Sequence, residues 1–228
     1  YTYDNVGNRR TMTDPAGLHA YTYDPLDQLT QTDTPAGFTF ADTTYAYDAV
    51  GNRLQTVDGG TTPYSPNNLN QYTDVGGTPF SYDPNGNLTS DGTRSYTFDS
   101  EHRLLTAAGP LGTATYTYDP LGRRLTKTVN GTATRFLYDG EDLIGETDAT
   151  GTLLASYVFG PGIDEPLRMT RGGVSHYYHA DGLGSIVALT DSTGATAESY
   201  TYDVYGTPTA PSALGNPFLF TGREYDSE

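Results

Sequence analysis

Two histidines and an aspartate lie close together in the sequence, at His176, His179 and Asp181, and these residue types are common metal ligands. On a β-strand, side chains three residues apart point to opposite faces, so the two imidazoles do not converge on one ion. We therefore expect no metal site here and no bound cofactor in the chain. His19 and His102 each stand alone, which favours packed or solvated positions on strands.

Neighbouring carboxylates could supply a general acid and a general base. Glu141 is followed by Asp142, and Asp164 is followed by Glu165. Adjacent residues rarely converge on one substrate, so we expect both pairs to be solvated turn residues. The chain has no cysteine and therefore no thiolate nucleophile. We predict that it is not an enzyme.

Two short segments are similar to ligand-binding loops. Residues 83–87 read Asp-Pro-Asn-Gly-Asn, but the glutamate that completes a calcium loop is missing. Residues 182–185 read Gly-Leu-Gly-Ser, without the lysine of a phosphate-binding loop. Proline second and glycine fourth are typical of a β-turn. We interpret residues 83–87 as a turn and expect no phosphate site at residues 182–185.

The charge balance limits the partners of the chain. Lys and Arg total 12 against 28 Asp and Glu, which gives a net charge of -16. Such a field repels phosphate backbones, so we expect no nucleic-acid partner. The longest apolar runs, 186–189 and 218–220, are too short to cross a bilayer, so we expect no membrane insertion.

Tyrosine replaces the aliphatic residues of an ordinary core. Low aliphatic content with a high net charge is typical of disordered chains. This chain, however, has 20 tyrosines, which favour strands and carry a large ring that can be buried. We predict a folded chain with a tyrosine-rich packing face.

The tyrosines belong to a repeated pattern, aromatic-x-aromatic-Asp, at a spacing of about 20 residues. Its copies begin at Tyr1, Tyr21, Tyr45, Phe80, Tyr96, Tyr116, Phe136 and Tyr200, with altered copies at Tyr64, Tyr157 and Tyr177. The alternation places both rings of a copy on one face of a strand. The strand aromatics that we single out are Tyr1, Tyr3, Tyr21, Tyr23, Tyr45, Tyr47, Tyr116, Tyr118, Tyr200 and Tyr202.

Each copy continues into a four-residue turn with aspartate first and glycine fourth. The predicted turn positions are Asp4, Gly7, Asp48, Gly51, Asp83, Gly86, Asp119 and Gly122. Aspartate caps the free amides of such a turn, and glycine accepts a positive φ next to a β-bulge. A strand then returns to a second glycine-containing turn, so each repeat is an antiparallel hairpin. No segment has the apolar stripe of a helix.

These elements predict an all-β fold, an antiparallel hairpin-repeat ribbon. Open sheets of more than ~10 strands curl or split, so we expect the ribbon to curl into part of a β-shell. Residues 1–156 hold the regular repeats. Residues 157–228 are less regular but continuous with the array.

The repeated Tyr-x-Tyr-Asp, with Gly-Asn-Arg after the turn at 7–9 and 51–53, resembles the YD repeats of bacterial RHS proteins, wall-associated proteins, insecticidal toxin complex C components and teneurins. Residues 160–167, 178–185 and 216–226 are similar to the RHS-associated core, so 157–228 resembles that core truncated at its C-terminal end. The resemblance implies a hollow cocoon that encloses a C-terminal toxin. In the family, aspartates farther along the core release the toxin, and no catalytic residue can be carried over to this chain.

These patterns lead to three hypotheses for the function. The first is a structural wall segment of a secreted or surface-displayed shell that encapsulates or displays a C-terminal, toxin-like cargo. The second is a cell-surface or glycan-binding adhesion repeat, in which rows of tyrosine stack on sugars. The third is an autoproteolytic core, whose aspartate motif is missing here. The partners expected are the remainder of a longer chain or further copies through edge strands, an enclosed toxin domain, and glycans.

Overall fold

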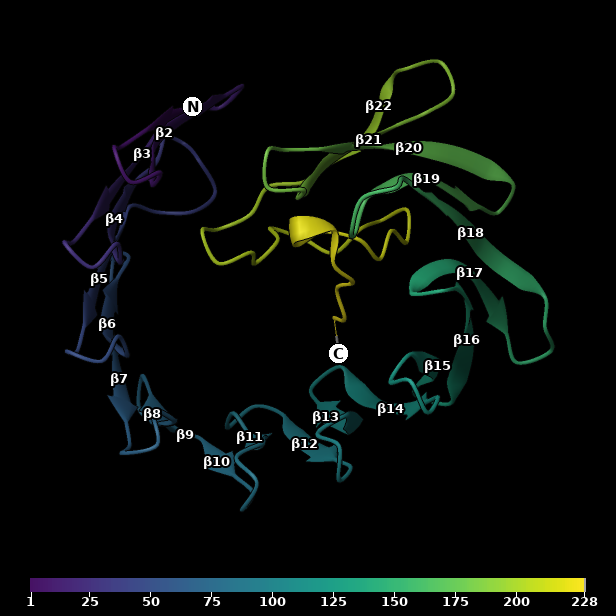
Figure 1. Ribbon diagram of the computed structural model, residues 1–228, viewed down its shortest axis with the longest axis horizontal. Coiled ribbons are helices and arrows are strands. Elements are labelled where there is room, and N and C mark those ends of the chain that lie inside the picture. The colour runs from purple at the N-terminus through teal and green to yellow at the C-terminus, as the bar shows by residue number, and fades with distance from the viewer. Residues whose placement is uncertain (228) are drawn as a thin grey trace. The chain divides into compact units, whose positions relative to one another are not determined.

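Antiparallel hairpins account for almost the whole chain, which confirms the predicted all-β class. The computed structural model describes residues 1–227, and its only helix in that range is one 3-10 turn, η1 (Phe220–Gly222) (Figure 1). The chain forms two compact units, residues 1–93 and a second unit that begins at Arg94. Within residues 1–227 no helix has the length and apolar character that a membrane crossing requires.

The first unit contains one nine-stranded sheet in sequence order and one further hairpin. The sheet is made of β1 (Thr2–Tyr3), β2 (Arg9–Asp14), β3 (Gly17–Tyr23), β4 (Leu29–Asp33), β5 (Thr43–Tyr47), β6 (Arg53–Val57), β7 (Thr61–Pro66), β8 (Tyr72–Val75) and β9 (Thr78–Pro79). The hairpin is made of β10 (Ser81–Tyr82) and β11 (Leu88–Ser90).

The second unit continues the same architecture, with each strand paired to the next. Its strands are β12 (Ser95–Phe98), β13 (Leu104–Gly109), β14 (Gly112–Tyr118), β15 (Arg124–Val129), β16 (Thr132–Asp139), β17 (Asp142–Asp148), β18 (Leu153–Phe159), β19 (Pro166–Arg171), β20 (Val174–Ala180), β21 (Ile186–Thr190) and β22 (Thr196–Ser199).

The Asp-x-x-Gly turns form because their aspartates satisfy amides that the chain reversal leaves free. Asp48 Oδ1 accepts hydrogen bonds from the amides of Val50 (3.0 Å) and Asn52 (2.8 Å). The amide of Gly51 donates to the carbonyl of Asp48 (3.2 Å), and Gly51 has a φ of 92°. Turns with the same cap begin at Asp4, Asp83 and Asp119, and their glycines Gly7, Gly86 and Gly122 have φ values of 99°, 88° and 87°.

The fourth turn position is not always glycine, and this changes the interpretation of one histidine. His102, expected on a strand, is the fourth residue of the turn that begins at Asp99, where it is exposed and has a φ of 63°. Asp27 and Asn70 hold the same conformation in two other turns. Histidine, asparagine and aspartate are enriched among non-glycine residues with positive φ.

A β-bulge follows each such turn and sets the register of the hairpin. Tyr47 pairs with Arg53, whereas its neighbour Ala46 pairs with Gln55, so Leu54 is the extra residue. The same irregularity places Tyr3 opposite Arg9 and Tyr118 opposite Arg124. In these three repeats the bulge therefore sets an arginine directly across from the second tyrosine, whereas Tyr23 and Tyr82 have a leucine opposite them.

The core of the second unit lies on the face that carries these aromatic rings. Its buried side chains include Phe136, Tyr157, Met169, Ile186, Leu189, Tyr200, Phe218 and Leu219. The strand aromatics differ in burial: Tyr21, Tyr116 and Tyr200 are buried, Tyr1 and Tyr3 are exposed, and Tyr23, Tyr45, Tyr47, Tyr118 and Tyr202 are intermediate. Packing against the rings requires a covering segment, which the C-terminal residues of this unit supply.

Candidate functional site

Three arginines that follow a turn each lie over two aromatic rings on the tyrosine face. We call each group an arginine–aromatic sandwich. The distances from guanidinium carbon to ring centroid are 5.8 and 4.7 Å for Arg9 over Tyr1 and Tyr21, 5.4 and 5.4 Å for Arg53 over Tyr45 and Tyr64, and 5.5 and 5.0 Å for Arg124 over Tyr116 and Phe136. A cation above a ring face is attracted by the quadrupole of the ring. The sandwiches therefore hold successive repeats together.

The second tyrosine of a repeat ties it to the preceding repeat through its hydroxyl group. Tyr23 Oη donates to the carbonyl of Arg9 (3.0 Å), and Tyr118 Oη donates to the carbonyl of Leu104 (2.8 Å). Burial raises the pKa of both phenols, so they remain neutral donors at physiological pH. The hydroxyl thus serves structure in these repeats.

A C-terminal strap, residues 214–227, covers part of this face in the second unit (yellow in Figure 1). The ring of Phe218 makes edge contacts with Tyr157 (centroids 5.1 Å apart), Phe159 (5.3 Å) and Tyr178 (6.2 Å). Leu219 beside it is almost fully buried. Aromatic pairs at these separations are favourable beyond the area that they bury. The apolar part of the strap therefore completes the core of the second unit.

A buried asparagine fixes the start of the strap. Asn216 Oδ1 accepts hydrogen bonds from Tyr178 Oη (2.8 Å) and the amide of Phe218 (3.0 Å). Its Nδ2 donates to the carbonyl of Phe218 (2.7 Å) and to Tyr200 Oη (3.2 Å). A fully satisfied buried amide specifies one conformation of its surroundings. Asn216 therefore positions Phe218 above the rings.

Two hydrogen bonds hold the middle of the strap to the start of β21 and to Ser185 just before it. The amide of Ile186 donates to the carbonyl of Leu219 (3.0 Å), and the amide of Thr221 donates to Ser185 Oγ (3.0 Å). Thr221 lies in η1 and has a φ of 52°. The strap is thus hydrogen-bonded to the start of β21 and is not itself a strand.

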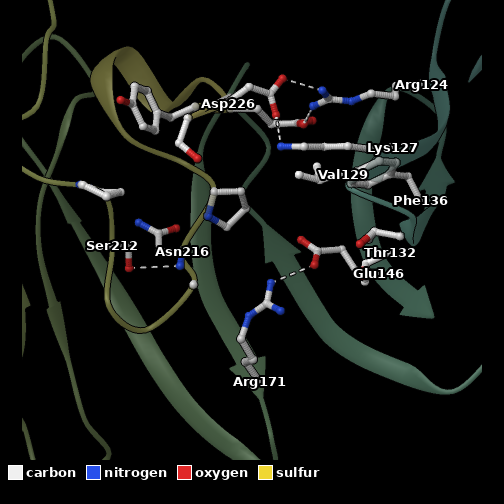
Figure 2. Close-up of a pocket in the computed structure, with 17 residues that line it drawn as sticks. Arg124, Lys127, Val129, Thr132, Phe136, Glu146, Arg171, Ser212, Asn216 and Asp226 are labelled. Atoms are coloured by element: carbon white, nitrogen blue, oxygen red, sulfur yellow. Dashed lines mark hydrogen bonds and ion pairs between the residues drawn. The ribbon is translucent and has the colours of Figure 1, made fainter. Parts of the chain in front are cut away.

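Two acids at the end of the strap bind the sandwich of Arg124. Glu224 forms an ion pair with Arg124, and Asp226 Oδ2 lies 2.5 Å from Arg124 Nη1 (Figure 2). Lys127 Nζ lies 2.6 Å from Asp226 Oδ1. Burial by itself would raise the pKa of Asp226, but the charges of Arg124 and Lys127 outweigh it and hold that pKa below its usual range. Burial likewise opposes the charge of Arg124, yet the two carboxylates raise its pKa.

A second charged group is formed by Glu146 and Arg171, together with the hydroxyl group of Tyr157. Glu146 is buried, and its Oε2 lies 2.8 Å from Arg171 Nη2. Tyr157 Oη donates to Glu146 Oε1 (2.5 Å) and accepts a hydrogen bond from Arg171 Nη2 (3.0 Å). Burial, and then the charge of Glu146, raise the pKa of Tyr157. Glu146 therefore has a positive partner and a neutral donor.

A cavity of about 320 Å³ lies between the strap and the sheet of the second unit (Figure 2). Its lining includes Val129, Thr132, Thr134, Phe136, Ser212, Pro217 and both charged groups. The three acids Glu146, Glu224 and Asp226 face Arg124, Lys127 and Arg171, so their charges balance. Each acid of the cavity therefore has a cation as its partner.

The histidines singled out in the sequence have different surroundings. His176 is buried and His179 is exposed on β20, where His179 Nε2 lies 2.9 Å from Thr190 Oγ1. Asp181 caps a turn by accepting the amides at 183 and 185. Within residues 1–227 no three side chains of metal-ligating type are grouped closely enough to hold an ion. His19 is buried on β3, with its Nε2 3.2 Å from Asp14 Oδ2.

One of the two carboxylate pairs differs from expectation. Glu141 and Asp142 are exposed. Asp164, by contrast, is only partly exposed, and its Oδ2 lies 2.9 Å from Arg223 Nη2 of the strap. Glu165 Oε2 accepts the amide of Gly162 (2.9 Å). The expectation of a solvated residue is wrong for Asp164 because the strap returns to meet it.

Sequence reasoning missed the residues that bind the strap, above all Arg124, Asn216 and Asp226. The only available signal was the arginine that follows the turn in three repeats, at positions 9, 53 and 124. Its partner Asp226 is 102 positions from Arg124 in the chain, and no periodicity links them.

Comparison with known proteins identifies the architecture. The family model described as Teneurin YD-shell matches residues 2–220. The tRNA3(Ser)-specific nuclease WapA of Bacillus spizizenii is 39% identical over 199 residues, and the tRNA nuclease WapA of Bacillus subtilis strain 168 is 40% identical over 199 residues. Each alignment covers 81% of this chain, and the chain spans only 8% of the length of either relative.

A solved structure of the Photorhabdus luminescens Tc holotoxin pore has a similar fold. The TM-score is 0.51 at 18% sequence identity, over 87% of this chain and 13% of that chain. The hairpin repeats, the tyrosine face and the match over residues 2–220 agree with one another. The chain is an RHS/YD-repeat protein and belongs to the Teneurin YD-shell family.

Proposed function

We propose that the chain is a segment of the wall of a secreted or surface-displayed shell that encloses a C-terminal, toxin-like cargo. The observation that carries this proposal is the strap, which brings the last described residues onto the tyrosine face of the second unit. In a longer protein, polypeptide that follows the strap would start from this face and not from the opposite one. The match to two tRNA nucleases, of which this chain spans 8%, supports a toxin as the cargo.

We further propose that this segment is a scaffold and that the catalytic groups of such a toxin lie outside it. The acids of the cavity are each bound to a cation within the wall. The net charge of -16 also disfavours contact with a tRNA backbone. Both features suit a wall better than a nuclease site.

The adhesion hypothesis has less support. A sugar stacks on the open face of an aromatic ring, but arginines already lie over Tyr21 and Tyr45 in the first unit. Phe218 makes edge contacts with the rings of Tyr157 and Tyr178 in the second unit. These contacts occupy ring faces on which a glycan would stack, and the tyrosines that stay exposed are Tyr1, Tyr3, Tyr177, Tyr205 and Tyr225.

Protease access to a tag tests the proposed function. A protease recognition sequence is joined to the C-terminal end of the chain, and the same sequence is placed before Tyr1 as the matched control. If the strap delivers following residues to the inner side of a wall, the C-terminal tag should be cut at least about tenfold more slowly, because cleavage then requires transient opening. The substitution Phe218→Ala should remove most of that difference. Equal cleavage of the two tags would contradict the proposal.

A further inference from the structure

The strap shows what an arginine–aromatic sandwich of this chain binds. Arg124 lies between Tyr116 and Phe136 and receives the carboxylates of Glu224 and Asp226. The rings hold the guanidinium in place from the sides. The N–H groups of the guanidinium that point away from the rings are then held in fixed positions. Their parallel arrangement matches the two oxygens of a carboxylate.

Arg9 in the first unit has the same surroundings without an acid. Its guanidinium lies 4.7 Å from the centroid of Tyr21 and 5.8 Å from that of Tyr1. Its side chain is partly exposed, and the one polar contact of its guanidinium within the described residues is Nη1 to Met12 Sδ at 3.8 Å. Among residues 1–227 no carboxylate forms an ion pair with Arg9. Apart from this contact, the guanidinium donors of Arg9 have no polar partner among the described residues.

The nearby acids are engaged elsewhere. Asp4 Oδ1 accepts the amides of Val6 and Asn8, at 3.0 and 2.8 Å. Asp14 Oδ1 accepts the amides of residues 16 and 17, and its Oδ2 faces His19. Moving either carboxylate to Arg9 would break a turn cap. A ligand for Arg9 must therefore come from another polypeptide segment.

We propose that the sandwich of Arg9, Tyr1 and Tyr21 is a docking site for an extended acidic peptide segment, with the chemistry that residues 218–226 present to Arg124. The occupant to which we commit is such a segment of the enclosed cargo, and this source rests on the proposed function. A carboxylate binds the guanidinium, and an aromatic or aliphatic side chain a few residues away packs on the exposed ring of Tyr1. The net charge of -16 repels acidic peptides in general, so binding depends on this local positive group.

Peptide binding to the complete chain tests the proposal. The probe is a fluorescent peptide with the sequence of residues 216–227, and its matched control carries E224Q and D226N. Fluorescence anisotropy is measured with the wild-type chain and with R9Q, R10Q and R124Q. Arg10 is the matched control for Arg9 because it is the adjacent arginine and is exposed.

The acidic peptide is expected to bind the wild-type and R10Q chains equally and R9Q about tenfold more weakly, as the loss of one charge-assisted contact predicts. R124Q should bind the peptide as the wild type does, because the chain's own strap occupies that site. The neutral peptide should bind the wild-type, R10Q and R124Q chains at least about tenfold more weakly than the acidic peptide does, and R9Q should bind the two peptides equally. Added salt should weaken the binding of the acidic peptide to the wild-type chain. R9K, which keeps the charge, should retain part of the affinity even if R9Q is poorly folded.

Three results would overturn the proposal. One is equal affinity of R9Q and R10Q for the acidic peptide, and another is equal binding of the two peptides. The third is self-association of the wild-type chain that R9Q abolishes, which would assign the site to the strap of a second copy. The tag experiment does not involve Arg9, so failure of either proposal is distinguishable from failure of the other.

Discussion

At the scale of the residue, each turn of this kind depends on one aspartate, or on Asn67 in the turn that ends at Asn70, and on one residue with positive φ. The aspartate accepts two amides, and the fourth residue adopts a conformation that costs a β-branched side chain free energy. Gly122, with a φ of 87°, has open space where a Cβ would be placed. Asp27, Asn70 and His102 show that small polar or imidazole side chains are also accepted there.

Gly122→Val should lower the free energy of unfolding by roughly 1 to 3 kcal/mol through backbone strain, since an added Cβ meets no neighbouring atom. Gly60→Val is the matched control, because Gly60 also has open space around it but no positive φ. Gly122→Asn should cost less than Gly122→Val. Denaturant unfolding measures all three. Equal loss of stability at positions 60 and 122 would mean that strain is not the cause.

At the scale of the element, the strap is the part of the second unit that connects distant strands. Hairpins contact their sequence neighbours, whereas Phe218 contacts rings of β18 and β20 together. The strap therefore links strands that the ladder joins only through β19. We expect the second unit to lose cooperativity when this contact is removed.

Phe218→Ala should destabilise the second unit by about 3 to 5 kcal/mol, because the ring is buried and its removal leaves a cavity. Ile163→Ala is the control, since Ile163 is 91% exposed and should change stability little. Hydrogen exchange resolves the location of the effect. Amides of β18 to β21 should exchange faster, while those of β2 to β6 stay unchanged. Uniform acceleration over both units would show that the strap is not a local element.

Much of the ladder could be predicted from the sequence because its information is local. Asp48 and Gly51 define a turn, and the alternation of Tyr45 and Tyr47 assigns their face within a few residues. The strap could not be predicted, because Arg124 and Asp226 have no shared periodicity or spacing rule. The turn position of His102 could not be predicted from a pattern that ends in glycine, because the fourth position requires a positive φ and not glycine itself. The division into residues 1–156 and 157–228 stays a prediction.

At the scale of the whole molecule, a repeated face of rings, arginines and hydroxyls joins successive hairpins, and a hydrophobic core adds to it in the second unit. A ladder of this kind exposes strand edges, which suits pairing with the remainder of a longer chain or with further copies. The strap places the end of the described chain on the ring-bearing face of the second unit. The proposed wall function depends on that placement more than on any other feature.

Crosslinking tests directly whether the strap lies on the tyrosine face. The chain has no cysteine, so only the introduced thiols can react. Thr134 and Ser227 line the same cavity, whereas Arg135 is exposed on the opposite face of β16. A short bifunctional maleimide should join the cysteines of the Thr134→Cys, Ser227→Cys chain within one molecule and should leave the Arg135→Cys, Ser227→Cys chain unjoined. Equal crosslinking of the two double variants, or crosslinking of the second alone, would contradict a strap that lies on the tyrosine face.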